Sequence, residues 1–233
     1  MRARRWPFAK GEAEQPREIE GLSIEPTTEI HRSPGLQAAL SHLSEDRPCN
    51  ILDLGPAVAG NIDFFSRYPC RLHIVDLLGR LADEPESAVR LELAPGAFFD
   101  ELLSIELDHF DLVLAWTVFD NLEKGAARRL ASHLARLTHE GARLFAIVAT
   151  GHGAGAGGLD FTICGHDTLE YRATGRPDHR SAPLKPAAFS KQLAGFAIDE
   201  SVVLRHGFQE YVAVRLGDQH EEAPDAERPD GTP

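Results

Sequence analysis

Short apolar runs alternate with helix-like segments along most of the chain. Five runs have the length and composition of strands that are covered on both faces: residues 49–54, 72–75, 89–93, 110–116 and 144–149. Such alternation is typical of an α/β fold, because each strand is followed by a helix that returns the chain to the same edge of the sheet. The pattern therefore predicts a largely parallel sheet.

The clearest helical pattern follows Asp120 and Asn121, either of which can cap a helix. One stripe of this helix is apolar, and it consists of Leu122, Ala126, Leu130, Leu134 and Leu137. Gly141 ends the pattern. A shorter helix is expected to begin at Pro186 and to end at Gly195, because proline suits the first helical position and glycine the residue past the end.

The last apolar stretch differs from the earlier ones. Residues 198–206 and 209–216 are two strand-like runs that meet at Gly207 and Phe208, a spacing typical of a hairpin. Added to the five earlier runs, the hairpin gives a seven-stranded, mostly parallel sheet that ends in an antiparallel pair.

Composition sets the limits of the domain. Residues 1–33 carry three prolines and scattered charge, so we expect a flexible N-terminal arm. The folded domain then covers residues 34–217, and a glycine-rich start marks 150–185 as an inserted loop or hairpin. Residues 218–233 contain six acids and one base and are expected to form a disordered acidic tail.

Charge and apolar content narrow the function classes. The chain has 233 residues, 42% of them hydrophobic, and a formal net charge of −12, which disfavours a nucleic-acid partner. We expect a soluble cytoplasmic protein, because no apolar run approaches the length of a membrane-spanning helix and the basic start of the chain leads into polar sequence without the apolar centre of a signal peptide. Cys49, Cys70 and Cys164 form no Cys-x-x-Cys pair and are expected to be reduced thiols.

The most informative segment runs from Ile51 through a turn of small residues into a predicted helix. Asp53 ends the first strand and Gly55 opens the turn, while Asp76 ends the next strand 21 residues after Gly55. In a doubly wound sheet a ligand lies outside the carboxyl ends of the strands, and an acid after the second strand accepts hydrogen bonds from ribose hydroxyls. The segment therefore predicts a ligand that contains a nucleoside.

The turn also indicates which nucleoside fits. Ala57 stands where a dinucleotide-binding turn has its second glycine, whose missing side chain lets a pyrophosphate approach the backbone. Asp53 would repel a pyrophosphate but tolerate, directly or through water, an ammonium or sulfonium charge. S-adenosylmethionine has the adenosine without a phosphate, so a methyl donor is favoured over a dinucleotide.

With these motifs the chain resembles the class I S-adenosylmethionine-dependent methyltransferases over about residues 35–216. The matching segments are Leu52-Asp-Leu-Gly, Val75-Asp76, Phe110-Asp-Leu-Val-Leu-Ala-Trp and Leu193-Ala-Gly-Phe-Ala-Ile. The resemblance implies a Rossmann-like, doubly wound sheet and S-adenosylmethionine as cofactor. We expect the methyl acceptor to be a small or medium-sized molecule that binds under the 150–185 insert.

The same resemblance assigns roles to individual residues. It places Gly55 and Ala57 at the methionine end of the cofactor and Asp76 at the ribose. Ala115 or Trp116 would lie near the methyl group. The chain departs from the family where an acid often follows the third strand, and after the fourth strand it lacks the Asn/Asp-Pro-Pro-Tyr of many amino-group methylases. No catalytic residue is identified.

Other interpretations of these residues stay open. Asp53 could hold the amides of the turn, Asp76 could cap the following turn, and Trp116 could belong to the core. The chain could then be a non-catalytic nucleoside-binding or regulatory protein on the same fold, or an NAD-dependent oxidoreductase, which Ala57 disfavours. His152, Cys164 and His166 fall short of the four ligands of a structural zinc site, so no metal is expected.

Overall fold

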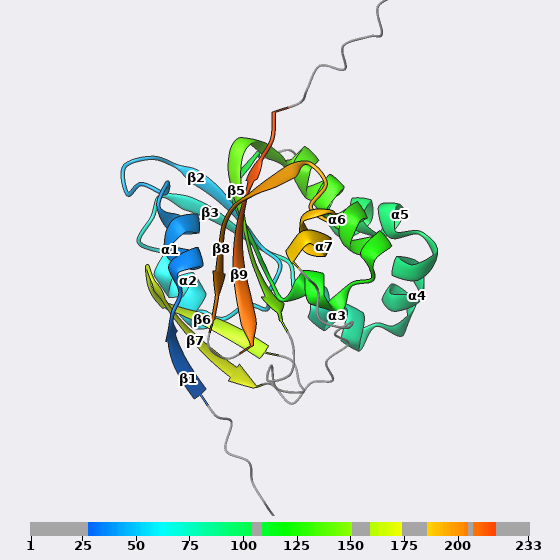
Figure 1. Cartoon of the computed structure of the whole chain (residues 1–233), viewed down its shortest axis with the longest axis horizontal. Helices are drawn as coiled ribbons and strands as arrows, with labels where there is room; N and C mark the ends of the chain where they lie inside the picture. The colour runs from blue at the N-terminus through cyan, green and yellow to red at the C-terminus, as the bar shows by residue number, and fades with distance from the viewer. Residues whose placement is uncertain (1–27, 104–108, 151–158, 174–185, 205–206, 218–233) are drawn as a thin grey trace, which may run out of the picture.

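The computed structural model describes residues 28–103, 109–150, 159–173, 186–204 and 207–217. Within these residues the strands form two sheets (Figure 1). The larger sheet has the strand order β3-β2-β4-β5-β9-β8, and the smaller one has the order β1-β7-β6. The fold is therefore mixed α/β, with one central sheet and one small additional sheet.

The central sheet is mostly parallel, as the alternating pattern predicts. Its strands are β2 (Cys49–Asp53), β3 (Cys70–Ile74), β4 (Phe110–Trp116), β5 (Thr138–Ala149), β8 (Phe196–Val203) and β9 (Phe208–Arg215). Strand β2 pairs in parallel with β3 and β4, and β4 pairs in parallel with β5. Strand β9 lies antiparallel between β5 and β8. Cys49 and Cys70 are register partners on β2 and β3, and both are free thiols.

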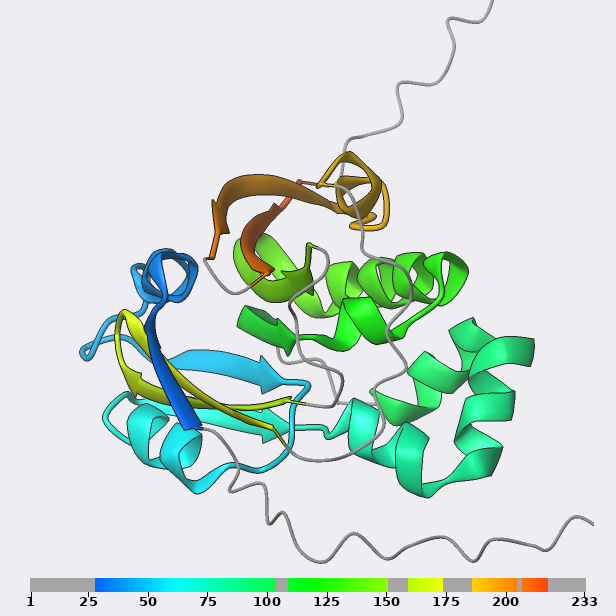
Figure 2. The ribbon, with the colours of Figure 1, turned by 60° about the horizontal axis from the view of Figure 1, so that its bottom comes forward.

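The prediction of seven strands is wrong: within the described residues the central sheet has six strands. Residues 89–93 belong to helix α4 (Pro85–Leu93), which has a proline in its first turn. Val89 is 52% exposed and Leu93 is 81% exposed, so this apolar run is not covered on both faces as a central strand would be. Helices α3 (Leu77–Asp83), α4 and α5 (Pro95–Leu102) follow β3, and in Figure 2 they lie together, away from the small sheet.

Helices cover both faces of the central sheet. One core cluster packs between the sheet and helices α5, α6 (Lys124–Leu137) and α7 (Pro186–Ser190). The other packs between the sheet and α1 (Pro34–Leu40), α2 (Ala59–Phe65) and the small sheet.

The predicted cap of α6 is wrong, because Asp120 and Asn121 belong to a preceding 3-10 helix, η1 (Val118–Asn121). The residue that precedes α6 is Glu123.

The small sheet corrects the predicted length of the N-terminal arm. Strand β1 (Thr28–Arg32) pairs antiparallel with β7 (Thr168–Ala173), which in turn pairs antiparallel with β6 (Leu159–Gly165). The next residue, Ser33, is buried and donates a hydrogen bond to Oε1 of Glu210 at 2.5 Å. Residues 28–33 are therefore part of the fold.

Several predicted segments lie outside the described residues. These are the rest of the arm at 1–27, the stretches 151–158 and 174–185 of the predicted insert, and the acidic tail at 218–233. The described part of the insert contains the β6–β7 hairpin. No described helix combines the length and apolar composition that crossing a membrane requires.

Candidate functional site

The candidate site lies at the carboxyl ends of β2, β3 and β4. From β2 the chain continues through α2 to β3 on one side, whereas β4 pairs with the other side of β2. Such a reversal of strand order is the topological switch point, where open α/β sheets bind their ligands. Backbone hydrogen bonds continue past the strands here: Val75 N donates to Asp53 O at 2.7 Å and Leu54 N to Leu114 O at 2.9 Å.

Asp53 is the buried carboxylate at this point, with a relative exposure of 1%. Its Oδ1 accepts two hydrogen bonds, from Nε1 of Trp116 at 2.6 Å and from the backbone N of Gly55 at 2.9 Å. Its Oδ2 is buried and has no hydrogen-bond partner among the described residues. The structure thus brings three of the predicted site residues into direct contact and leaves one buried acceptor unsatisfied.

Burial raises the pKa of the Asp53 carboxyl to about 6. The hydrogen bonds from Trp116 and Gly55 favour the charged form and oppose this rise, while the nearby carboxylate of Asp76 adds to it. At neutral pH the group is ionised but poorly solvated. A ligand cation or N–H donor that reached Oδ2 would therefore be favoured by both charge and hydrogen bonding.

Gly55 and Trp116 fit closely against each other. A Cβ atom placed on Gly55 would lie 2.7 Å from Cδ1 of Trp116, so only glycine leaves room for the indole. On β6, Phe161 stacks on the indole with ring centroids 5.4 Å apart and planes 6° from parallel. Aromatic packing therefore connects the turn after β2 to the small sheet.

Asp76 lies at the end of the chain segment that follows β3 and caps helix α3. Its Oδ1 accepts a hydrogen bond from the backbone N of Gly79 at 2.8 Å. A Cβ atom on Gly79 would meet the Asp76 carboxylate, which explains the glycine at this position. The capping role that the sequence left open is therefore present, and the carboxylate is also close enough to Asp53 to raise its pKa.

The remaining two predicted residues lie apart from this contact. Ala57 is exposed in the turn between β2 and α2. Ala115 is fully buried on β4 and belongs to the core cluster on the α6 side, whereas Trp116 belongs to the cluster on the α1 and α2 side. Adjacent residues of a strand point to opposite faces, so only Trp116 brings its side chain to the Asp53 carboxylate.

Sequence reasoning missed Asn61, which joins α2 to the small sheet. Its Nδ2 donates to the carbonyl oxygen of Phe161 at 3.1 Å, and its Oδ1 accepts from the backbone N of Ile163 at 2.7 Å. Gly60 allows this approach, because a Cβ there would lie 2.4 Å from Cγ2 of Thr162. Neither partner is near Asn61 in sequence, so the only local signal was a polar residue within an apolar helix.

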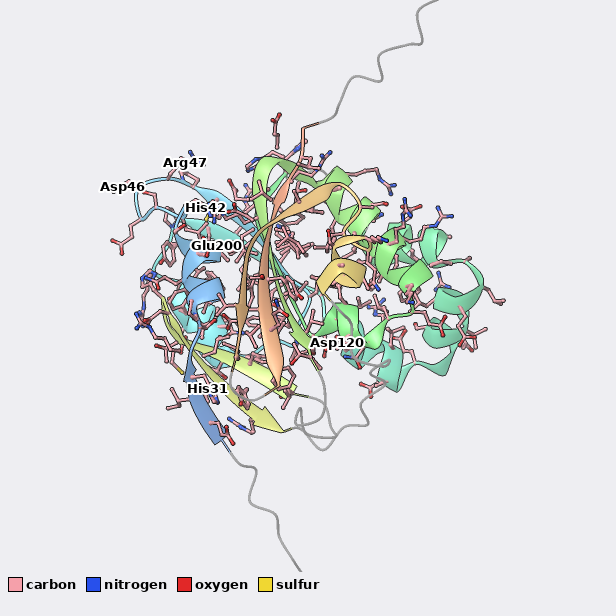
Figure 3. The ribbon with its side chains drawn as sticks, viewed as in Figure 1. His31, His42, Asp46, Arg47, Asp120 and Glu200 are labelled. Carbon is pink, nitrogen blue, oxygen red and sulfur yellow. The ribbon has the colours of Figure 1, made fainter. Side chains whose placement is uncertain are left out.

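Asp120 was expected to cap a helix and instead connects η1 to β5. Its Oδ2 accepts a hydrogen bond from the backbone N of Ala149 at 2.6 Å, and the residue is buried. In Figure 3, Asp120 lies far from His42, Asp46 and Arg47. His42 contacts the backbone oxygen of Asp111 near the amino-terminal end of β4, whereas Asp120 follows the carboxyl-terminal end of that strand in η1.

The described residues contain no group of three histidine, cysteine or acidic side chains that could hold a metal ion. Cys164 is exposed, and His166 lies against the hydroxyl of Tyr68 at 3.3 Å. His152 falls outside the described residues.

No protein-family model and no curated protein matches the chain. Solved structures that it resembles include S-adenosylmethionine-dependent methyltransferases. One is the 1,6-didemethyltoxoflavin-N1-methyltransferase of Burkholderia thailandensis, crystallised with 1,6-didemethyltoxoflavin and S-adenosylhomocysteine. It is 18% identical to this chain, the match covers 79% of this chain and 77% of that chain, and the TM-score is 0.46. Another is the CcbJ methyltransferase of Streptomyces caelestis, at 16% identity, 79% and 90% coverage and a TM-score of 0.46. The N-methyltransferase NodS of Bradyrhizobium japonicum gives 14% identity, 79% and 93% coverage and a TM-score of 0.45.

Proposed function

We propose that this protein binds S-adenosylmethionine at the carboxyl ends of β2, β3 and β4 and transfers its methyl group to a small or medium-sized acceptor. The observation that carries the proposal is Oδ2 of Asp53, a buried carboxylate oxygen without a partner among the described residues. An unsatisfied buried acceptor is costly, so its presence at the switch point favours a ligand that supplies the missing donor. The ammonium group of S-adenosylmethionine is such a donor.

The charge of the site supports this cofactor over a dinucleotide. Asp53 and Asp76 are close enough to interact, and both would repel a pyrophosphate. In the proposed arrangement Asp53 and the turn containing Gly55 and Ala57 hold the methionine end. Asp76 accepts hydrogen bonds from the ribose in addition to capping α3.

The acceptor is proposed to bind beside the strand ends, under the 150–185 insert. In the described part of that insert, strand β6 lies against α2 through Asn61, and its Phe161 stacks on Trp116. Methyl transfer is an in-line displacement, for which the protein's main contribution is to hold the acceptor atom about 3 Å from the methyl carbon. Such a reaction requires no metal and no covalent intermediate with the protein.

A second candidate is a non-catalytic protein that keeps the fold. Trp116 favours it, because the indole already occupies Oδ1 of Asp53 and fills the space over Gly55. Similarly, the Asp76 carboxylate already accepts a hydrogen bond from the backbone N–H of Gly79. Both acids that the fold would offer to a nucleoside therefore have protein partners.

Calorimetric titration of the full chain with S-adenosylmethionine, S-adenosylhomocysteine and NAD tests the proposal. We expect the chain to bind S-adenosylmethionine and S-adenosylhomocysteine but not NAD. The matched variant Asp53→Asn should bind both of these ligands more weakly than wild type. Release of S-adenosylhomocysteine in the presence of a panel of small amine, hydroxyl and aromatic acceptors then tests catalysis. Binding of NAD alone would refute the methyl-donor assignment, and binding without release of product would favour the non-catalytic candidate.

A further inference from the structure

The backbone of Trp116 adopts a conformation that L-residues rarely take. Its φ is +45°, and it is the only non-glycine residue with a positive φ among the described residues. Large side chains avoid this left-handed region because Cβ approaches the backbone, so the surrounding structure has to hold the residue in place. Such outliers cluster at functional sites, which directs attention to what the Trp116 side chain contacts.

The contacts of the indole fix its position from several directions. Nε1 donates to Oδ1 of Asp53 at 2.6 Å, and one face stacks on Phe161. Phe145 packs edge-on against the ring, with centroids 5.9 Å apart and planes at 90°. The absence of a side chain on Gly55 provides the remaining space. The indole N–H is therefore aimed at a single oxygen of a single carboxylate.

This arrangement makes the two oxygens of Asp53 unequal. Without a fixed donor, a carboxylate can rotate and exchange its oxygens between partners. Here Oδ1 receives both the Trp116 and the Gly55 N–H groups, while Oδ2 stays buried and without a partner among the described residues. The Asp53 side chain is thus held with Oδ1 hydrogen-bonded and with Oδ2 available to another donor.

We propose that Trp116 is a positioning residue for the cationic end of the cofactor: its N–H holds Oδ1 of Asp53 and so reserves Oδ2 for the ammonium group of the ligand. This inference rests on the proposed function. It assigns Trp116 a role through Asp53 and no direct contact with the methyl group. It also explains why a strained backbone and a glycine at position 55 occur together.

Two adenosine ligands separate this role from a purely structural one. S-adenosylhomocysteine carries the amino-acid group with its ammonium, whereas 5′-methylthioadenosine has the same adenosine and thioether without it. A positioning role predicts that changes at Trp116 weaken only the first ligand. A structural role predicts that both ligands weaken together, because a disturbed fold affects the whole site.

The experiment is calorimetric titration of the full chain with both ligands. Trp116→Phe removes the N–H and keeps an aromatic ring, and Asp53→Asn removes the charge. Both variants are expected to bind S-adenosylhomocysteine about 10- to 100-fold more weakly, the range for loss of a charged hydrogen bond, and 5′-methylthioadenosine within about twofold of wild type. Phe161→Leu is the control, because it removes the stacking partner and leaves the N–H in place, and it should not change the ratio of the two affinities.

Each outcome decides a different point. Equal weakening of both ligands by Trp116→Phe, or no weakening of S-adenosylhomocysteine, would overturn the positioning role while leaving the proposed function intact. Failure of the wild type to bind either ligand would refute the proposed function and this inference with it. If Trp116→Phe does not fold, Trp116→His, which keeps a ring N–H donor, is expected to preserve the affinity ratio, and a loss confined to S-adenosylhomocysteine in this variant would contradict the proposal.

Discussion

The buried carboxyl of Asp53 makes the stability of the fold depend on pH. An aspartate in an unfolded chain has a pKa near 4, whereas burial raises that of folded Asp53 to about 6. Between these values the folded state binds more protons than the unfolded state. The contribution of Asp53 to the free energy of unfolding is therefore fully present below about pH 4 and is lost as the pH rises through about 6.

The size of this effect follows from the shift. About two pKa units correspond to about 3 kcal/mol, which is an upper value because the unfolded chain retains some structure. For a fold of this length, 1 kcal/mol changes the melting temperature by about 2–4 °C. Asp53→Asn keeps an oxygen for the N–H groups of Trp116 and Gly55 but has no titrating carboxyl at this position. Its free energy of unfolding should therefore not fall through this group as the pH rises through about 6.

The assay is urea unfolding of the ligand-free full chain at several pH values from 4.5 to about 7.5, for wild type and Asp53→Asn. Glu210 is a second buried carboxyl whose pKa burial raises, and it contributes equally to both proteins. The difference between the two profiles therefore isolates Asp53. Asp63→Asn serves as control, because it changes an exposed carboxyl on α2. Parallel profiles for wild type and Asp53→Asn would refute the reasoning.

Two further substitutions test the surroundings of the site. Asn61→Ala leaves the Phe161 carbonyl and the Ile163 amide without their partner, so we expect a loss of about 2–4 kcal/mol in unfolding free energy and faster hydrogen exchange in β6. Asn50→Ala, at a half-buried position of β2 away from β6, is the control, and unchanged exchange in β6 on Asn61→Ala would contradict the docking role. Asp76→Ala should cost about 1 kcal/mol through loss of the α3 cap. If Asp76 also binds ribose, S-adenosylhomocysteine binding falls about 10- to 1,000-fold in calorimetry, and unchanged affinity with lowered stability would remove Asp76 from the site.

The sheet could be predicted because its strands carry a local signal. Apolar runs such as 110–116 are long enough to be buried on both faces, and the structure places β4 there with nearly every residue buried. The contact between Asp53 and Gly55 is also local, since a strand-end acid two residues before a turn can reach its amide. Short-range geometry of this kind is encoded within a few residues.

Residues 89–93 show where the same reasoning fails. The segment is apolar at every second position, as a strand would be, but Pro85 and Pro95 frame it with favourable first positions for helices. A five-residue run cannot be assigned by periodicity alone, and the flanking prolines decided the outcome. The sequence also lacks the acid that often follows the third strand of the family it resembles, and the central sheet contains no strand in residues 89–93.

The contacts that define the candidate site are the least accessible to sequence reasoning. Trp116 reaches Asp53 across 63 positions of the chain, and it does so through a backbone angle that no tryptophan is expected to adopt. Asn61 meets β6 about 100 positions later. Contacts at such separations depend on the tertiary arrangement, so the sequence indicated which residues to consider but not which of them touch.

The arrangement of charge links these contacts to the proposed ligand. Asp53 has one oxygen bound by protein donors and one buried without a partner, and Asp76 adds negative charge nearby. A phosphate placed here would meet two carboxylates, both of which would repel it. A cationic group would instead satisfy Oδ2 and offset the desolvation of Asp53, because opposite charges interact more strongly in a poorly solvated site than in water. In the proposed function, the left-handed Trp116 and Gly55 hold Asp53 with one buried oxygen available to a cationic group of the ligand.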